Sequence, residues 1–106
     1  MRMVGYIGSM SVATTYAFAA NPQRDDLSMH LGGELRIQVS KYHNLYQFRT
    51  YEDFQACNFT NATFCSRPNN VYVFQPTQAG MYYFGCSLGE GAAHCQKGAK
   101  FQVKVI

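Results

Sequence analysis

The sequence contains no cluster of lysine and arginine, no long apolar run and no Cys-x-x-Cys pair. The formal net charge is only +3, and without a basic stretch we expect no nucleic-acid partner. Without an uninterrupted apolar segment we expect no transmembrane helix. The missing Cys-x-x-Cys pair disfavours a structural zinc site among the four cysteines.

Charged residues are also scarce, at 14%, whereas hydrophobic residues make up 47% of the chain. This composition is typical of a folded chain and not of a disordered one. With 106 residues, we expect a single domain that spans residues 1–106. Residues 1–20 superficially suit a signal peptide, but Gly, Ser and Thr interrupt their apolar run. We therefore expect this segment to belong to the mature fold.

The alternation of apolar and polar residues predicts a mainly β structure. Leu35, Ile37 and Val39 alternate with polar residues in segment 34–40, and segment 100–106 repeats this pattern. Further strands are predicted at residues 3–7, 45–51, 71–75 and 81–86, with a strand or irregular segment at 11–19. Loops are predicted at 21–26 and 58–70, a hairpin turn at 76–80 and a short helical turn at 51–56. Six to eight strands without a long helix favour an antiparallel sandwich or a Greek-key barrel.

Residues with metal-binding chemistry gather around the segment 80–104. A predicted strand carries Cys86 into a glycine-containing loop, which returns with His94, and His43 lies at a corner between two strands. Two imidazoles and one thiolate are the donor set of trigonal blue-copper electron-transfer sites. We find no nucleophile–base pair, so we expect a metal-binding redox protein and not an enzyme.

Two glycosylation sequons lie beside Cys57, Asn58-Phe59-Thr60 and Asn61-Ala62-Thr63. Four cysteines in a small chain indicate an oxidising compartment. We therefore expect a secreted or cell-surface glycoprotein, with Asn58 and Asn61 as the candidate glycosylation sites.

Short motifs along nearly the whole chain resemble those of the phytocyanins, a plant-type family of cupredoxins. They are Val4-Gly5, Leu31-Gly32-Gly33, His43-Asn44-Leu45, the segment from Phe54 to Asn58, the strand from Gly80 to Cys86, and the ending from His94 to Lys100. Each motif is short, but their order and spacing together are specific. The resemblance implies an all-β, cupredoxin-like Greek-key sandwich or barrel of about seven to eight strands, stapled by a disulfide.

The resemblance also implies the ligands and the disulfide. One copper ion would be held by His43, Cys86 and His94, and would exchange one electron at a time with a redox partner, either a protein or a small molecule. A disulfide between Cys57 and Cys95 would close the loop of residues 57–95 and stabilise the fold by roughly 4 kcal/mol.

The chain departs from the family pattern at the axial ligand. The family's axial Met or Gln falls at Ala99, and an alanine side chain cannot bind a metal. Three alternatives follow: an axial position that is empty or filled by water, which we favour, a carboxylate ligand from Glu90, or an approach by Gln96.

The fourth cysteine, Cys65, leaves the function open. A Cys65–Cys86 disulfide would abolish the copper site and leave a metal-free extracellular binding domain. Otherwise Cys65 is free, buried or engaged in an intermolecular bridge. Copper storage or delivery would use the same ligands as electron transfer, so the sequence does not separate these functions.

Overall fold

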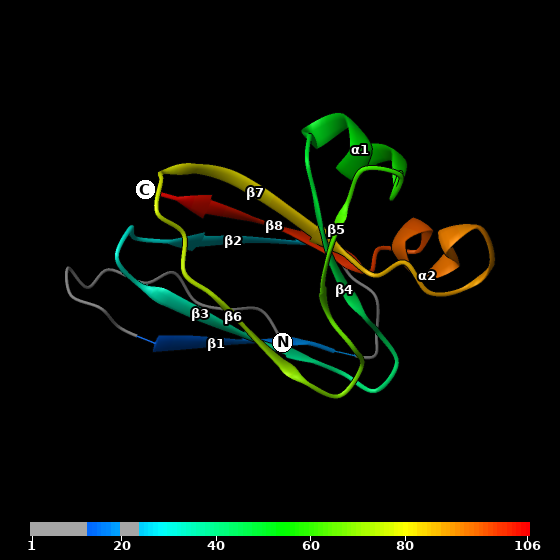
Figure 1. Cartoon of the computed structure of the whole chain (residues 1–106), viewed down its shortest axis with the longest axis horizontal. Coiled ribbons are helices and arrows are strands. Elements are labelled where there is room, and N and C mark those ends of the chain that lie inside the picture. The colour runs from blue at the N-terminus through cyan, green and yellow to red at the C-terminus, as the bar shows by residue number, and fades with distance from the viewer. Residues whose placement is uncertain (1–12, 20–23) are drawn as a thin grey trace.

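The computed structural model describes residues 13–19 and 24–106. Eight strands, two short α-helices and one 3-10 helix follow one another in this part of the chain (Figure 1). They are β1 (Ala13–Phe18), β2 (Asp25–Met29), β3 (Glu34–Val39), β4 (Leu45–Phe48), α1 (Tyr51–Ala56), β5 (Thr63–Ser66), β6 (Val71–Phe74), β7 (Gly80–Gly85), η1 (Glu90–Ala92), α2 (Ala93–Gln96) and β8 (Lys100–Val105).

The strands form two sheets that face each other. One sheet has the order β1-β3-β6 and the other the order β2-β8-β7-β4-β5. In Figure 1 the first sheet is the lower layer, and α2 projects beyond one end of the sandwich. The all-β sandwich is thus confirmed, but its sheets are mixed: β1 pairs with β3, and β2 with β8, in parallel. A purely antiparallel arrangement was the wrong prediction.

Most of the predicted elements are present. Alternation in β3 buries Leu35, Ile37 and Val39, and alternation in β8 buries three more residues in the same way. The short helical turn is α1, whose first turn is capped by Thr50, since its hydroxyl accepts a hydrogen bond from the Asp53 N–H. The strand predicted at residues 3–7 lies outside the described residues.

Three local predictions were wrong. Asp25 and Asp26 do not lie in a loop but begin β2, where the buried Asp25 carboxylate accepts a hydrogen bond of 2.7 Å from the Tyr16 hydroxyl. The predicted loop 58–70 contains β5, which pairs with β4 next to a register shift. Residues 76–80 do not close a hairpin, because they carry the chain from β6 in one sheet to β7 in the other.

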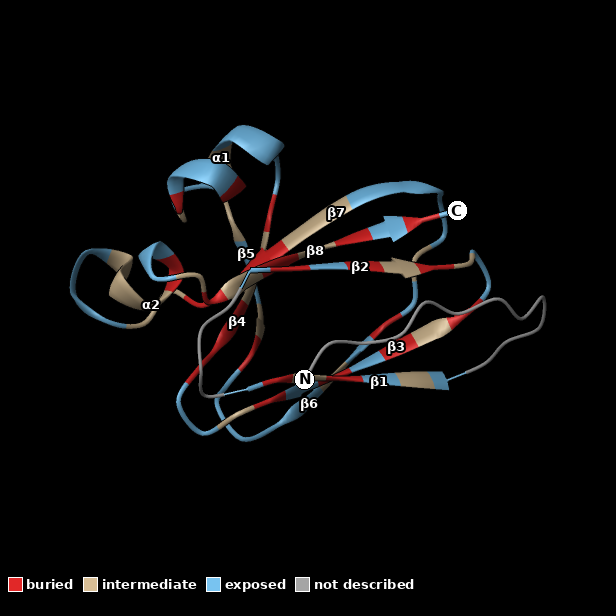
Figure 2. Ribbon diagram, turned by 180° about the vertical axis from the view of Figure 1, so that it is seen from behind, coloured by how far each residue is buried: buried red, intermediate tan, exposed pale blue. Residues whose placement is uncertain are grey.

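Two groups of buried side chains stabilise the sandwich. The main core fills the space between the sheets, and Figure 2 shows buried residues along β3, β4, β7 and β8. The outer cluster lies beneath α1 and consists of Phe48, Phe54, Cys57 and Cys95, with partly buried neighbours including Tyr83. Gly85 lies between Phe84 and Cys86 of the main core and packs closely against the outer cluster, since a Cβ atom there would lie 2.8 Å from the Phe48 ring.

Among the described residues, no helix has the length and apolar character needed to cross a bilayer. The helices that are present contain three to six residues each.

Candidate metal centre

Three segments bring His43, Cys86 and His94 together at the end of the sandwich that carries α2. His43 lies in the turn between β3 and β4, Cys86 directly follows β7, and His94 lies on α2. One potential ligand atom from each residue falls within 4.8 Å of the others. The Cys86 Sγ lies 3.7 Å from the His94 Nδ1, and the two imidazole rings are nearly perpendicular, with centroids 5.3 Å apart.

The His43 side chain is almost fully buried, and only 1% of the residue is exposed. Neither of its ring nitrogens has a hydrogen-bond partner among the described residues. The Phe18 ring stacks on the imidazole with a centroid distance of 4.7 Å, which fixes the ring plane. Burial lowers the pKa of His43 and His94 lowers it further, whereas the Ala19 carbonyl raises it, although this carbonyl does not meet the geometry of a hydrogen bond to either ring nitrogen. A neutral imidazole with unpaired buried nitrogens is destabilising by itself, and a metal ion would supply the missing interaction.

The Cys86 thiol is also fully buried. Burial raises its pKa, and the backbone N–H groups of Leu88 and Asn44 oppose this effect. The Leu88 N–H lies 3.4 Å from the sulfur. These two donors point at the atom that would carry the negative charge of a thiolate, which is the form that binds metals.

A pair of hydrogen bonds joins the His43 corner to the Cys86 loop. The Asn44 side-chain Nδ2 donates to the Ser87 hydroxyl at 2.9 Å, and the Ser87 backbone N–H donates to the Asn44 Oδ1 at 2.8 Å. Because Asn44 follows His43 and Ser87 follows Cys86 in the chain, this reciprocal pair of hydrogen bonds fixes the positions of His43 and Cys86 relative to each other.

His94 is fixed from two directions. The next residue, Cys95, forms the disulfide with Cys57 that the family resemblance implied, with their Cα atoms 5.9 Å apart. On the other side, the Ala99 N–H donates to the His94 carbonyl at 2.9 Å, and the Ala99 carbonyl accepts from the Cys86 N–H at 3.1 Å. Ala99 thus ties both loop residues of the cluster to the start of β8. Unlike His43, His94 is only partly buried.

Comparisons with known proteins agree with this fold. No family model matches the chain. The cucumber peeling cupredoxin of Cucumis sativus is 31% identical over 64 residues, which are 60% of this chain and 44% of that protein. The solved structure of the copper(II) form of cucumber stellacyanin superposes with a TM-score of 0.60 at 28% identity, and covers 73% of this chain and 68% of its own. The chain thus has a cupredoxin-like fold and is similar to phytocyanin-type cupredoxins. It spans less than half the length of its curated relative.

The structure brings neither axial candidate into the cluster. Glu90 is exposed at the start of η1, and it is absent from the group of converging donors. Gln96 is exposed on the far side of α2, where its amide lies 3.5 Å from the Ala56 carbonyl. Ala99, at the position of the family's axial ligand, is fully buried. The identity of an axial ligand stays a prediction.

Cys65 and Cys86 both remain free thiols, so the alternative Cys65–Cys86 disulfide is not formed. Cys65 lies half-buried on β5, with its sulfur 3.6 Å from the Thr63 carbonyl. Burial raises the pKa of this thiol, and a hydrogen bond with the Tyr72 side chain opposes the effect. Cys65 therefore belongs to the packing between the edges of the two sheets and not to the cluster.

Sequence reasoning missed Phe18, which orients His43. The alternation of Tyr16 and Phe18 in β1 was the available signal, since both residues point into the main core. The poor alternation elsewhere in residues 11–19 concealed it. Both sequon residues, Asn58 and Asn61, are exposed, and the Asn58 Oδ1 accepts a hydrogen bond from the Thr60 N–H.

Proposed function

We propose that this chain is a mononuclear electron-transfer protein, in which His43, Cys86 and His94 hold one copper ion. The observation that carries the proposal is the convergence of these three donors within 4.8 Å, with both nitrogens of the buried His43 left without a partner. Two imidazoles and a thiolate suit both oxidation states of copper. Bound copper would supply the one-electron redox chemistry.

Other residues of the chain would hold the copper ligands in place and determine which side of the site contacts a redox partner. The Asn44–Ser87 pair and the Ala99 backbone hold the donors in place, so that little has to move when the charge of the site changes. His43 is enclosed by the protein, whereas His94 is partly exposed. We therefore assign the contact with the redox partner to the His94 side of the site.

A titration of the metal-free protein with Cu(II) tests this assignment. We expect an intense visible absorption from thiolate-to-copper charge transfer, at a stoichiometry of one ion per chain. The variant Cys86→Ser should lose the absorption, whereas Cys65→Ser is the matched control that removes the other free thiol and should keep it. A colourless wild-type protein with two titratable thiols would overturn the proposal.

The axial position is tested on the same spectrum. We propose that it is open or filled by water, because Glu90 and Gln96 both lie outside the cluster. The substitutions Glu90→Ala and Gln96→Ala should then leave the spectrum unchanged. Ala99→Met, which restores a residue type of the family, should shift it. A shift with Glu90→Ala would instead identify that carboxylate as a ligand.

Voltammetry distinguishes electron transfer from copper storage or delivery. An electron carrier should give a reversible one-electron wave, with the copper bound in both oxidation states. A storage or delivery protein should release the metal readily to a competing chelator and show no reversible wave.

We also propose that the protein works outside the cytosol. The Cys57–Cys95 disulfide is favoured in oxidising compartments, and Asn58 and Asn61 are both exposed for glycosylation. Protein isolated from its own source should lose mass on enzymatic deglycosylation. The double variant Asn58→Gln with Asn61→Gln, expressed in a eukaryotic secretory host, should lack this mass change.

A further inference from the structure

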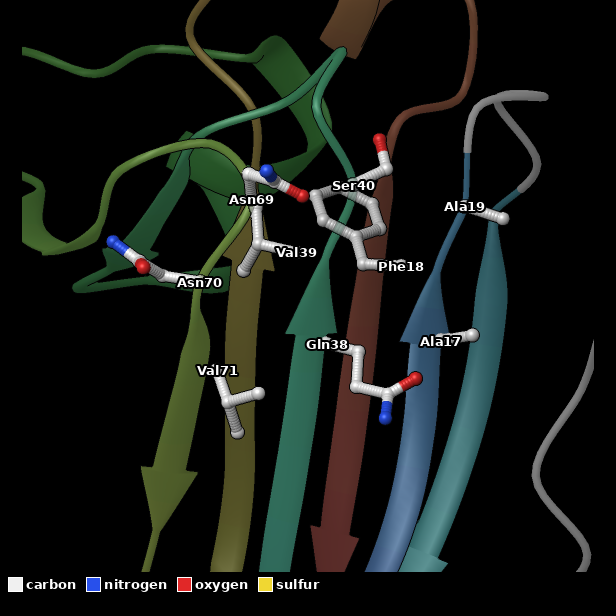
Figure 3. Close-up of a pocket in the computed structure, with 9 residues that line it drawn as sticks. All are labelled: Ala17, Phe18, Ala19, Gln38, Val39, Ser40, Asn69, Asn70 and Val71. Carbon is white, nitrogen blue, oxygen red and sulfur yellow. The ribbon is translucent and has the colours of Figure 1, made fainter.

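We infer that this protein has a second binding site, separate from the metal cluster, that takes a neutral polyhydroxylated ligand such as a sugar unit. The site is an open pocket of about 370 Å³ on the β1-β3-β6 sheet, near the end of the sandwich that carries the cluster (Figure 3). This volume lies within the usual range for small-molecule sites.

All three strands of the sheet contribute to the pocket, together with the segment before β6. Ala17 comes from β1, Gln38 from β3 and Val71 from β6, and Figure 3 shows these side chains across the sheet. Asn69 and Asn70 come directly before β6, and in the same view Asn69 lies at the upper edge of the pocket and Asn70 at its left side. A sheet carries the floor, so the pocket does not depend on a flexible loop for its shape.

The backbone of the rim is fixed by hydrogen bonds, whereas the side-chain amides are free. The Asn70 carbonyl accepts from the Val39 N–H at 2.8 Å, and the Asn69 N–H donates to the Ser40 carbonyl at 3.1 Å. Among the described residues, the side-chain amides of Gln38, Asn69 and Asn70 make no hydrogen bond, and all three residues are exposed. Three residues that line one pocket thus carry carboxamides without partners of their own.

The chemistry of the lining selects the class of ligand. None of the described residues that line the pocket is charged, so a phosphate or carboxylate would find no cation to pair with. Each carboxamide offers both donors and an acceptor, as each sugar hydroxyl does. The side chains of Ala17 and Val71 add apolar surface, which suits the C–H face of a sugar ring. A purely apolar ligand would leave the surrounding amides desolvated and unpaired.

Phe18 connects this pocket to the metal cluster. It lines the pocket on one side and stacks on His43 on the other. The pocket is nonetheless formed without any of the three cluster residues, so ligand binding does not require copper.

The test is an NMR titration of the metal-free protein with a panel of methyl glycosides of hexoses and pentoses and their disaccharides. We expect at least one of them to bind with a dissociation constant of about 1 mM. Binding should shift the side-chain NH2 resonances of Gln38, Asn69 and Asn70. Sodium phosphate, titrated in parallel, should leave them unchanged.

Variants locate the binding and supply the control. Gln38→Ala and Asn70→Ala should each weaken binding of the same sugar roughly tenfold, because each removes one two-way hydrogen-bonding group. Gln78→Ala removes an exposed carboxamide from the connection between β6 and β7 and should leave binding unchanged. The proposal is overturned if no sugar of the panel shifts the pocket amides at ~100 mM, a hundredfold excess over the expected dissociation constant. Equal weakening by Gln78→Ala, or shifts with phosphate instead, would overturn it as well. The outcome is independent of copper binding, because the protein is free of metal throughout.

Discussion

His43 and Cys86 are held by the main core, whereas His94 is held by the outer cluster. Cys86 is a member of the main core, and the Phe18 ring of that core lies against His43. His94, in contrast, is the chain neighbour of Cys95, which belongs to the outer cluster. The candidate metal centre thus lies at the junction of two packing units.

The two units are stabilised in different ways. The main core is large, and its aromatic rings contact one another, for example Phe101 with Tyr16 at 4.8 Å and with Phe84 at 5.1 Å between centroids. The outer cluster has only four buried residues and adds a disulfide. It is also flanked by Lys100, whose ammonium donates to the Phe54 carbonyl at 2.8 Å and lies over the Phe54 ring. A small group of buried side chains needs such additional bonds, because it removes little apolar surface from water.

Removing the disulfide should show the largest difference between the two units. The double substitution Cys57→Ser with Cys95→Ser should lower the free energy of unfolding by about 4 kcal/mol, because the unfolded chain regains the freedom of a closed loop. Chemical denaturation measures this loss. The Cu(II) affinity should fall as well, since His94 loses its anchor.

Cys65→Ser is the control for this experiment, because it changes a cysteine outside both the disulfide and the metal cluster. A loss below about 1 kcal/mol in the double variant would mean that the outer cluster holds His94 without its covalent bond, and the comparison would fail.

The same division explains what the sequence could predict. The strands of the main core, such as β3 and β8, have strict alternation because one face of each is buried. The Cys57–Cys95 pairing and the cluster of His43, Cys86 and His94 came from a family resemblance and not from periodicity. The structure contains that disulfide and brings these three residues together.

Other features depend on contacts between distant residues, which local patterns do not record. Asp25 begins β2, which pairs with β8, and its buried carboxylate accepts a hydrogen bond from the Tyr16 hydroxyl; neither residue indicates this alone. The four-residue strand β5 exists because β4 offers it an edge, although its neighbourhood is rich in Asn and Thr. The segment between β6 and β7 has the composition of a hairpin turn, but it connects two different sheets. The prediction was wrong because turn residues indicate a change of direction and do not specify which strands pair.

Gly85 provides a test of how closely β7 packs against the outer cluster. An alanine Cβ at this position would lie 2.8 Å from the Phe48 Cε2, closer than such atoms approach. Gly85→Ala should therefore lower the free energy of unfolding by roughly 2 kcal/mol through overpacking. The backbone there is not left-handed, so the loss is steric and not conformational.

Combining Gly85→Ala with Phe48→Leu tests whether the loss of stability comes from the clash with the Phe48 ring. If the ring is the obstacle, the smaller side chain at position 48 should recover part of the loss, and the two substitutions should be strongly non-additive. Additive losses would show that the Phe48 ring is not the obstacle.

Phe18→Leu should weaken the packing of the main core against His43 without affecting the outer cluster. It removes the ring stacked on His43 at 4.7 Å while leaving the outer cluster untouched, and should lower the free energy of unfolding by about 1.5 kcal/mol. The Cu(II) spectrum should change too, because the His43 imidazole loses the surface that fixes its plane.

Phe74→Leu is the matched control, since Phe74 is a main-core phenylalanine whose ring contacts those of Tyr82 and Phe84 instead of His43. It should lose similar stability without altering the spectrum. If both variants change the spectrum equally, the orientation of His43 depends on the whole core and not on its stacked neighbour.

The smallest expected effect is at the start of α1. Thr50→Ala removes the hydroxyl that accepts a hydrogen bond from the Asp53 N–H at 3.1 Å, and should lower the free energy of unfolding by about 1 kcal/mol. Thr50→Ser keeps a hydroxyl at this position and should keep the stability of the wild-type protein. Hydrogen exchange locates the loss. Because α1 covers the outer cluster, its amides should exchange faster while those of β3, in the main core, stay protected. Equal acceleration in both places would show that the two units unfold as one, and that His94 and His43 depend on a single cooperative core.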